Sequence, residues 1–385
     1  LLHEATAQIT SNLVVFGVTG TKGKTTATYF IHQICSYLKV PCAYIGTLGV
    51  MFRDHHVETL NTTPSLEFLL NTFVLLKKLG CRAVAIECSS IGLDQGRLDG
   101  VQFDGVLFTG LGRDHLDYHK TMSGYFLAKR RLFDLLTKSP KARKSAVIVA
   151  GSKWSDKLVQ GYSKKINITQ IASKSVRLLK ASPKRSEFKV KSMKLRMNFF
   201  FPQFVVLALA VKSLIEGYFA KKLPFQILTK LRFPPGRFQV VGDFVVVDYA
   251  HTPESLEFAI RCLKQAFKKP VVTVFGCGGN RDPGKRPIMG RVASELSDYT
   301  IITSDNPRFE DPMSIIEDVY RGVSNRTKVE KIPNRQRAIQ TAIKKAIELR
   351  GYALIAGKGH ENYQIIGSRR IKFSDIDVAK KALES

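Results

Sequence analysis

Residues 17–26 read G-V-T-G-T-K-G-K-T-T and directly follow the apolar run L-V-V-F at residues 13–16. An apolar strand that leads through a glycine-rich turn into a helix is typical of sites for nucleotide phosphates, because backbone N–H groups of the turn converge on the anion. Lys24 can reach the terminal phosphates, and the Thr25 hydroxyl suits a magnesium ion. The alternative is an ordinary strand-to-helix turn, because the general phosphate-loop pattern requires glycine where this chain has Val18.

Short apolar runs alternate with amphipathic stretches in the first part of the chain. The predicted strands are 13–16, 42–45, 83–86 and 106–108. This alternation predicts a parallel sheet with helices on both faces. The basic segment of residues 145–196 alternates more loosely and is expected to hold short antiparallel strands, followed by a helix over residues 204–216.

A turn-rich break, F-P-P-G-R at residues 233–237, separates this series from a second one. The second series of predicted strands is 244–247, 271–275, 299–303 and 352–356. We therefore expect two domains of the α/β class, residues 1–232 and the smaller 233–385. The first is expected to be a P-loop parallel-sheet ATPase domain and the second a Rossmann-like domain.

Composition excludes several classes of protein. With 385 residues and 44% hydrophobic content the chain is globular, and its apolar stretches are too short to predict membrane insertion. The six cysteines include no C-x-x-C pair, which argues against a zinc site or a disulfide framework and favours a reducing compartment. Net charge is +28, and residues 138–196 hold 17 Lys or Arg against Asp156 and Glu187. This basic segment suits nucleic acid or an acidic partner; the alternative is a solvated basic surface.

Two predicted strands end in residues that suit magnesium chemistry. Glu87 follows the strand 83–86, and His115 lies shortly after the strand 106–108. Ligands of open parallel sheets bind beyond the carboxyl ends of the strands, where the Gly20–Thr26 loop is also expected. Taken singly, such a glutamate is usually a solvated cap and such a histidine is usually structural. Three strand ends that converge on one loop favour a magnesium and nucleotide site.

Eight motifs follow one another in the order expected of the Mur ligases, and the chain resembles that family from about residue 13 to 380. The motifs are T-G-T-K-G-K-T-T (19–26), N-T-T-P (61–64), E-C-S-S-I-G-L-D-Q-G-R (87–97), R-D-H-L-D-Y-H (113–119), D-Y-A-H-T-P (248–253), G-C-G-G-N-R-D (276–282), S-D-N-P-R (304–308) and A-G-K-G-H-E (356–361).

The resemblance implies an ATP-dependent, magnesium-dependent reaction of peptidoglycan synthesis. ATP would phosphorylate the carboxylate of UDP-MurNAc-L-Ala-D-Glu, and the amine of meso-diaminopimelate would attack the acyl phosphate. It implies that Lys129 is the family lysine that becomes carbamylated, which turns a cation into an anion able to bind metal. The implied catalytic residues are Lys24, Glu87, His115 and Lys129, and the implied metal ligands are Thr25, Glu87, His115 and Lys129.

The resemblance also implies three sets of binding residues. The ATP set is Gly20, Thr21, Lys22, Gly23, Lys24, Thr25, Thr26, Arg237, Asp248 and His251. The UDP-MurNAc-dipeptide set is Thr62, Thr63, Ser89, Gln95 and Arg97. The meso-diaminopimelate set is Arg281, Asp305, Asn306, Pro307, Arg308, Gly357 and Glu361. Arg308 would grip the distal carboxylate of the diamino acid, whereas the alternative for D-N-P-R is a simple proline turn.

The chain departs from the family pattern in several respects. The first predicted strand begins at Leu13, so the family's amino-terminal uridine-binding domain is not expected. Lys22 replaces the usual asparagine of the loop, and Ile91 and Gly110 replace a common histidine and asparagine. Residues 201–205, F-P-Q-F-V, lack both asparagines that help bind the nucleotide near its adenine. Each lost hydrogen bond is worth roughly 0.5–1.5 kcal/mol, which predicts weaker or less base-selective ATP binding.

Three functions stay open at this point. The first is an active ligase that adds meso-diaminopimelate, in the cytoplasm or in the stroma of a plastid or other organelle. The second is a catalytically weakened family member that serves as a structural or nucleic-acid-associated protein, for example in a plastid transcription complex. The third is another amide ligase with a different acceptor.

Overall fold

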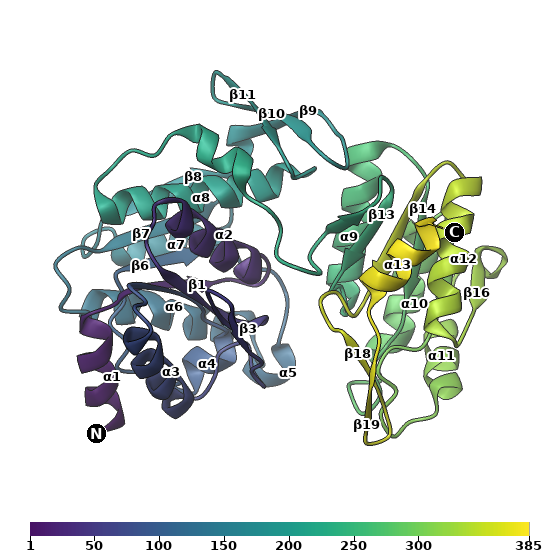
Figure 1. Cartoon of the computed structure of the whole chain (residues 1–385), viewed down its shortest axis with the longest axis horizontal. Coiled ribbons are helices and arrows are strands. Elements are labelled where there is room, and N and C mark those ends of the chain that lie inside the picture. Colours follow the sequence, from purple (N-terminus) through teal and green to yellow (C-terminus); the bar gives the residue numbers. More distant parts are fainter. Residues whose placement is uncertain (385) are drawn as a thin grey trace. The chain divides into compact units, whose positions relative to one another are not determined.

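The computed structural model describes residues 1–384 and divides into two compact units. The first unit comprises Leu1–Lys180 and Ser186–Arg232, and the second comprises Ala181–Arg185 and the chain from Phe233 onward. The main division therefore follows Arg232, at the turn-rich F-P-P-G-R segment. Each unit has its own sheet and its own layers of helices (Figure 1).

An eight-stranded sheet forms the centre of the first unit, in the order β4-β3-β2-β5-β1-β6-β7-β8. The six strands from β2 to β8 in this order are parallel, and β3 and β4 continue the sheet in antiparallel pairing. The four strands predicted within residues 13–108 are confirmed. The bounds are β1 Val14–Thr19, β2 Cys42–Gly46, β3 Gly49–Phe52, β4 His55–Val57, β5 Ala83–Glu87, β6 Gly105–Phe108, β7 Ser145–Ala150 and β8 Ile168–Ala172.

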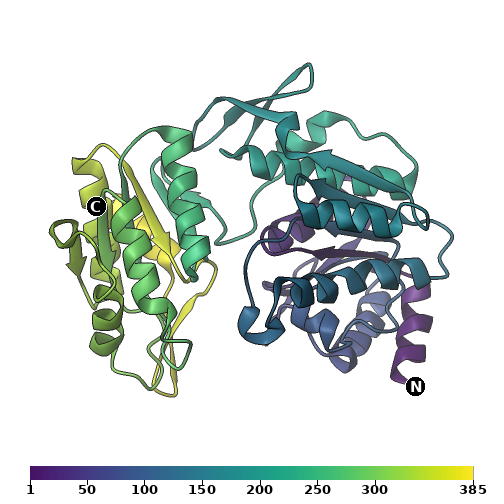
Figure 2. The same cartoon turned by 180° about the vertical axis from the view of Figure 1, so that it is seen from behind.

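Helices cover both faces of this sheet (Figures 1 and 2). On one face α2 (Lys24–Tyr37) and α8 (Pro202–Phe219) pack against the strands and against each other. On the other face a core cluster joins apolar residues of the strands to α3 (Leu66–Lys78), α6 (Met122–Lys138) and α7 (Lys153–Tyr162). The remaining helices are α1 (Leu2–Ser11), α4 (Ser90–Asp94) and α5 (Leu116–His119).

The prediction for the basic segment was partly wrong. Residues 145–150, S-A-V-I-V-A, form β7, which pairs in parallel with β6, and β8 pairs in parallel with β7. A nearly continuous apolar run is what a strand covered on both faces requires, so β7 suits the interior of the parallel sheet. Only β9 (Val176–Lys180), β10 (Ser186–Val190) and β11 (Met193–Met197) form the expected antiparallel sheet.

The predicted helix over residues 204–216 is confirmed and is longer than expected. Pro202 occupies the first turn of α8, a position that needs no backbone N–H donor. Within residues 1–384, α8 is the one helix that length and composition would allow to cross a membrane, and 61% of its apolar window is buried inside the protein. It packs on β6, β7 and β8, as a core helix does.

The second unit contains a six-stranded sheet in the order β12-β13-β17-β14-β15-β16, parallel except for β12. Its core joins these strands to α12 and α13. The strands are β12 Gln239–Val241, β13 Val245–Asp248, β14 Val271–Phe275, β15 Tyr299–Ile302, β16 Val329–Lys331 and β17 Tyr352–Ala356, with a hairpin of β18 Tyr363–Ile366 and β19 Arg369–Lys372. The helices are α9 Pro253–Phe267, α10 Lys285–Leu296, α11 Pro312–Tyr320, α12 Arg335–Glu348 and α13 Asp375–Glu384. The four strands predicted in this part are confirmed.

Candidate active site

The glycine-rich loop connects β1 directly to α2. Gly20 has φ +150°, and a Cβ atom there would lie 1.9 Å from the Thr109 hydroxyl oxygen, so the position tolerates only glycine. Thr109 donates to the Lys22 carbonyl over 2.6 Å, and the Thr21 N–H donates to the Gly110 carbonyl over 2.9 Å. The segment after β6 therefore holds the loop against the amino terminus of α2, where free N–H groups and the helix dipole favour an anion.

Two lysines converge on this loop. The Lys24 ammonium donates to the Gly20 carbonyl over 2.9 Å, and the Lys129 ammonium donates to the same oxygen over 2.8 Å. Lys129 lies on α6, is 1% exposed, and has its Nζ atom 4.4 Å from the centroid of the Tyr125 ring. Burial, and then the nearby Lys24 charge, hold the pKa of Lys129 well below its ordinary value. The loop thus brings the Lys24 charge and the buried amine of Lys129 to the place where a phosphate chain would lie.

Glu87, at the end of β5, is fully buried and held by three neighbours. Thr25 donates to its Oε2 atom over 3.0 Å, the Thr47 N–H donates to Oε1 over 2.9 Å, and the Tyr44 hydroxyl also donates to Oε1. The structure therefore brings Thr25 and Glu87 together, as predicted. Sequence reasoning missed Tyr44 and Thr47, although β2 pairs in parallel with β5, so its carboxyl end lies at the same edge of the sheet as Glu87.

His115 immediately precedes α5, at its N-cap position, in the left-handed backbone conformation with φ +51°. Its Nε2 atom lies 3.7 Å from Asp114 Oδ2, and its ring centroid lies 6.1 Å from that of Tyr125. Desolvation lowers the pKa of His115, with further lowering by Lys24 and Lys129 against the opposing effect of Asp114. His115 and Lys129 are thus both neighbours of Tyr125, whereas Thr25 and Glu87 form a separate pair.

These residues fit magnesium unequally. The Thr25 hydroxyl and the Glu87 carboxylate are the oxygen donors that Mg²⁺ prefers. A protonated Lys129 would repel the ion, and only a carbamate on its nitrogen would supply oxygen ligands. Across residues 1–384 no group of three or more His, Cys, Asp and Glu side chains is placed to hold a metal. The candidate metal site therefore centres on the Thr25 hydroxyl and the Glu87 carboxylate, and Lys129 can contribute to it only when modified.

The five residues predicted to bind the UDP-linked substrate form one network beside Glu87. Thr63 donates to the Glu87 carbonyl over 2.8 Å and to the Ser89 hydroxyl over 3.0 Å. Arg97 donates to the Thr63 carbonyl over 2.8 Å and to the Gln95 amide oxygen over 2.9 Å. Thr62 completes the network, because its hydroxyl lies 3.3 Å from that of Thr47.

In the second unit, polar residues gather beyond the carboxyl ends of β15 and β17. Lys358 is completely buried, and its ammonium group donates to Asn306 Oδ1 and to Glu361 Oε2, each over 3.0 Å. Asn306 also donates to Glu361 over 2.9 Å, and Asp305 Oδ1 lies 3.8 Å from Lys358 Nζ. Gly357 packs against Asp305, since a Cβ atom on Gly357 would lie 2.6 Å from Asp305 Oδ2. Lys358, which sequence reasoning missed, is therefore the centre of this cluster.

Arg308 is held at this cluster by its backbone as well as its side chain. It adopts φ +53°, and its N–H donates to the Ile365 carbonyl over 3.0 Å. One guanidinium nitrogen donates to the Gly279 carbonyl over 2.8 Å. Arg281 lies exposed in the segment after β14, and Pro307 is buried. The structure thus brings together the residues of the predicted diamino-acid set that follow β15 and β17.

The residues of the second unit predicted to bind ATP lie around the end of β13. Asp248 accepts a hydrogen bond from the Phe238 N–H over 2.9 Å. The Arg237 guanidinium stacks over the Tyr249 ring at 4.6 Å, and its buried Nε has no hydrogen-bond partner within residues 1–384. The His251 Nδ1–H group donates to the Tyr249 carbonyl oxygen over 2.9 Å. An unsatisfied arginine nitrogen suits an anionic ligand.

Comparison with known proteins agrees with this geometry. The family model for the Mur ligase middle domain matches residues 18–206, and that for the Mur ligase glutamate ligase domain matches residues 236–359. The chain belongs to the Mur ligase family. Mur ligases are ATP-dependent enzymes that form amide bonds, and the expected fold class is confirmed.

Several relatives of this Mur ligase carry the name UDP-N-acetylmuramoyl-L-alanyl-D-glutamate--2,6-diaminopimelate ligase. The protein of Geobacillus kaustophilus is 38% identical, over 97% of this chain and 80% of its own length. That of Synechococcus elongatus is 37% identical, over 98% of this chain and 78% of its own length. A solved structure with the same name has a TM-score of 0.65 and 32% identity, over 97% of this chain and 78% of the other. Folylpolyglutamate synthase of Mycobacterium tuberculosis, at 14% identity and TM-score 0.68, shows the fold alone.

The departures of this Mur ligase from its family pattern have structural consequences near the loop. Phe201 and Phe204, at the start of α8, pack with ring centroids 5.9 Å apart, and Val205 is fully buried. Leu207 lies 3.2 Å from where a Cβ atom of Gly23 would stand. The amino terminus of α8 therefore meets the loop with apolar side chains, and Pro202 and Val205 offer no side-chain amide at the two positions where the resemblance predicted asparagine.

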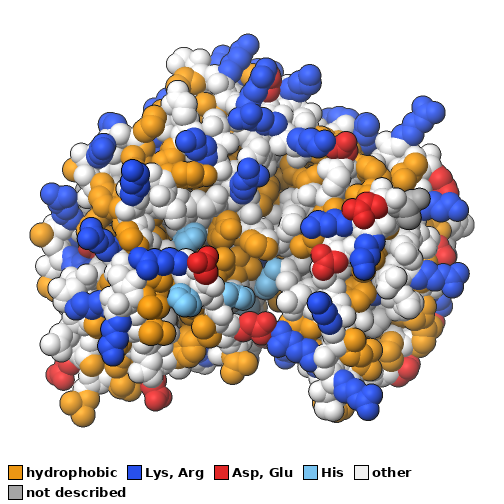
Figure 3. Space-filling view, viewed as in Figure 1, with side chains coloured by type: hydrophobic (Ala, Val, Ile, Leu, Met, Phe, Trp, Pro, Cys, Tyr) orange, Lys and Arg blue, Asp and Glu red, His pale blue; other side chains and the backbone are white. Residues whose placement is uncertain are grey.

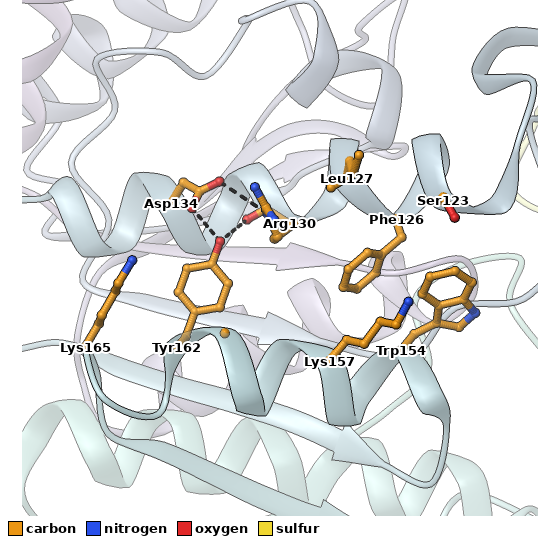
Figure 4. A pocket seen from close by; sticks show the side chains of 10 residues that line it. Ser123, Phe126, Leu127, Arg130, Asp134, Trp154, Lys157, Tyr162 and Lys165 are labelled. Carbon is orange, nitrogen blue, oxygen red and sulfur yellow. Dashed lines mark hydrogen bonds and ion pairs between the residues drawn. The ribbon is translucent and has the colours of Figure 1, made fainter.

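Two further features lie outside the loop site. Figure 3 shows Lys and Arg side chains gathered at the top of the view, where Figure 1, drawn from the same side, labels the three-stranded sheet β9–β11. A cavity of about 420 Å³ lies between α6 and α7 (Figure 4), and neither the loop nor Lys129 lines it. Its lining residues are Ser123, Phe126, Leu127, Arg130, Asp134, Trp154, Lys157, Gly161, Tyr162 and Lys165.

Proposed function

We propose that this Mur ligase joins meso-diaminopimelate to UDP-MurNAc-L-Ala-D-Glu with ATP, through an acyl-phosphate intermediate. The observation that carries the proposal is the Thr25–Glu87 pair, 3.0 Å apart, beside a loop on which Lys24 and Lys129 converge. Such an arrangement supplies the charge neutralisation and positioning that phosphoryl transfer requires. The relatives' shared name supports the choice of substrates.

The chain's own residues divide the work of phosphoryl transfer. Backbone N–H groups of the loop and the amino terminus of α2 bind the phosphates, and Lys24 neutralises the charge that develops on them. Thr25 and Glu87 would hold one Mg²⁺, and His115 would help to hold a second, with a carbamylated Lys129 as a further metal ligand. When bound, the ion would neutralise phosphate charge as a Lewis acid. Burial of Lys129 favours its neutral amine, which is the form that reacts with carbon dioxide.

The substrate residues have separate tasks. Arg97, fixed by Thr63 and Gln95, would orient an anionic group of the UDP-linked substrate. Asp305 and Glu361 would bind the ammonium groups of the diamino acid, and Arg308 would bind its distal carboxylate. Lys358 holds the carboxylate of Glu361 in place, because its ammonium group donates to Glu361 Oε2 over 3.0 Å. Arg237, Asp248 and His251 are proposed to bind ATP.

Phosphate release from ATP tests this function. Release should require both UDP-MurNAc-L-Ala-D-Glu and meso-diaminopimelate, and it should be lost in Lys24→Ala. The matched control is Lys77→Ala, which removes an exposed lysine of α3 and should turn over like the native protein. Release with either substrate alone, or equal rates in Lys24→Ala and native protein, would contradict the proposal.

The basic segment supports a second candidate. Residues 138–196 carry 17 Lys or Arg, and the weakened nucleotide site at α8 suits a family member retained for binding rather than for turnover. Salt-dependent binding of duplex DNA or RNA, together with no substrate-dependent phosphate release, would favour this candidate. The expected location of the ligase is the cytoplasm, and that of the binding protein is an organelle stroma.

A further inference from the structure

A completely buried ion pair joins α12 to α13 in the second unit. Arg335 is the first residue of α12, Asp375 is the first of α13, and both side chains are 0% exposed. Arg335 Nε donates to Asp375 Oδ1 and an Nη atom donates to Oδ2, each over 2.8 Å. The pair is therefore a bidentate contact with its guanidinium plane fixed.

The other donors of Arg335 contact the ends of two strands. One Nη atom donates to the Ser304 carbonyl over 3.3 Å, and the other donates to the Ala356 carbonyl over 3.0 Å. Ser304 follows β15 and Ala356 ends β17, and β14 lies between these strands in the sheet. One planar group thus spans two strand ends that are not neighbours.

Both contacted carbonyls immediately precede residues of the proposed diamino-acid pocket. Ser304 leads into Asp305 and Asn306, and Ala356 leads into Gly357 and Lys358. Lys358 also connects the same two segments, through its 3.0 Å contact with Asn306. The spacing of the two segments therefore depends on Arg335 at the strand ends and on Lys358 within the cluster.

We infer that Arg335 is a positioning residue for the diamino-acid substrate: it sets the spacing between the segments after β15 and β17, and Asp375 fixes its orientation. This inference rests on the function proposed above. An isolated buried ion pair adds little stability compared with apolar residues of similar volume. Apolar residues cannot, however, donate to the Ser304 and Ala356 carbonyls. Lysine cannot replace the planar arrangement of five donors either.

The double variant Arg335→Met/Asp375→Leu separates positioning from stability. It removes both charges together, so no unpaired buried charge remains, and its unfolding temperature should stay within a few degrees of native. The KM for meso-diaminopimelate in phosphate release should rise about tenfold or more, while the KM values for ATP and the UDP-linked substrate stay unchanged. Arg335→Lys should raise the KM for the diamino acid in the same way.

The matched control is Lys212→Met/Glu216→Met, which removes a largely buried ion pair on α8 of the first unit. It should leave the KM for the diamino acid unchanged. Amide hydrogen exchange supplies a readout that needs no turnover: amides in residues 305–308 and 357–361 should exchange faster in Arg335→Met/Asp375→Leu, and those of β14 should not.

The outcomes distinguish the two proposals. A native protein without diaminopimelate-dependent release would overturn the proposed function, and hydrogen exchange would then decide the role of Arg335. A well-folded double variant with a native KM for the diamino acid, or with native exchange at residues 305–308 and 357–361, would overturn the inference.

Discussion

Lys24 and Lys129 donate to one carbonyl oxygen, that of Gly20, over 2.9 and 2.8 Å. The two residues lie 105 positions apart in the sequence, on α2 and α6, and Lys129 is almost completely buried. Two cations this close are unfavourable without an anion, and burial adds to the cost of the protonated amine. The arrangement is therefore suited to a bound phosphate chain and to a neutral or modified Lys129.

Replacing Lys129 by methionine should stabilise the protein most at low pH. The folded-state pKa of Lys129 lies below the unfolded-state value, for which 10.5 is the ordinary figure. The unfolded chain then binds the proton more tightly, so the cost of burying Lys129 is full below the folded-state pKa and vanishes as pH rises toward 10.5. Urea unfolding from pH 6 to 10, in buffer free of bicarbonate, should show that the difference in unfolding free energy between Lys129→Met and the native protein becomes smaller as pH rises.

Added bicarbonate provides a second readout on the same proteins. A carbamate forms only on the folded protein's buried neutral amine, so bicarbonate should stabilise the native protein and leave Lys129→Met unchanged. Lys157→Met, which changes an exposed lysine of α7, is the control and should match the native protein throughout. A difference in unfolding free energy between Lys129→Met and the native protein that stays constant with pH would contradict a lowered pKa of Lys129.

Replacing Tyr44 by phenylalanine should loosen Glu87. The change removes one hydrogen bond to a buried carboxylate, which costs about 1.5–3 kcal/mol of unfolding free energy. Phosphate release should fall as well, because Glu87 is then oriented by Thr25 and Thr47 alone. Tyr29→Phe is the control. The centroid of the Tyr29 ring lies 6.2 Å from that of Tyr44, and within residues 1–384 no hydrogen bond joins the Tyr29 hydroxyl to Glu87. Denaturant unfolding measures both variants, and equal losses of unfolding free energy in Tyr44→Phe and Tyr29→Phe would refute the role assigned to the Tyr44 hydroxyl.

Alanine at Gly20 should be far more harmful than alanine at Gly110. Both glycines have positive φ, +150° and +124°, so both variants carry backbone strain of roughly 1–3 kcal/mol. Only Gly20→Ala also drives its Cβ atom into the Thr109 hydroxyl, whereas no atom lies within 4 Å of a Cβ at Gly110. ATP affinity, measured by calorimetry, should be lost in Gly20→Ala and largely retained in Gly110→Ala. Equal affinities would show that the loop adapts.

Alanine should have opposite effects at two helical glycines. Gly161 lies in α7 at the cavity, with no atom within 4 Å of a Cβ, so Gly161→Ala should stabilise the protein by about 0.5–1 kcal/mol. Gly217 lies in α8, where a Cβ atom would stand 2.4 Å from the Ser145 hydroxyl oxygen. Gly217→Ala should therefore destabilise the protein. Thermal unfolding of both variants checks these two predictions. A higher unfolding temperature in Gly217→Ala would contradict the packing of α8 on β7.

Removing the Arg308 guanidinium should reduce the preference for meso-diaminopimelate over L-lysine as the acceptor. Hydrogen bonds to a charged group are worth about 1.5–3 kcal/mol, which corresponds to roughly 10- to 150-fold in discrimination. Phosphate release with each amino acid measures the ratio in Arg308→Ala. Arg321→Ala, at the exposed end of α11, should keep the native ratio. An unchanged ratio in Arg308→Ala would mean that another group reads the distal carboxylate.

Much of the fold followed from local pattern. Apolar runs bounded by turns predicted β1, β2, β5 and β6, and the same pattern predicted four strands of the second unit, because buried parallel strands are short and almost wholly apolar. The basic segment was harder: β7 and β8 joined the parallel sheet although a looser alternation suggested hairpins. Whether a strand pairs in parallel or antiparallel depends on which distant strand lies beside it, and local pattern does not contain that information.

By itself the sequence determined the family and the glycine loop, and it predicted Lys24, Thr25 and Glu87 as the chemical groups of that loop, because each depends on residue type at fixed spacing. Only the tertiary structure decided how these groups are held. It placed Tyr44 and Thr47 on Glu87, buried Lys129 against Tyr125, and set Arg335 across two strand ends. Burial, and hydrogen bonds between residues far apart in the chain, arise only when the sheet brings its strand ends to one edge, so they are properties of the folded chain.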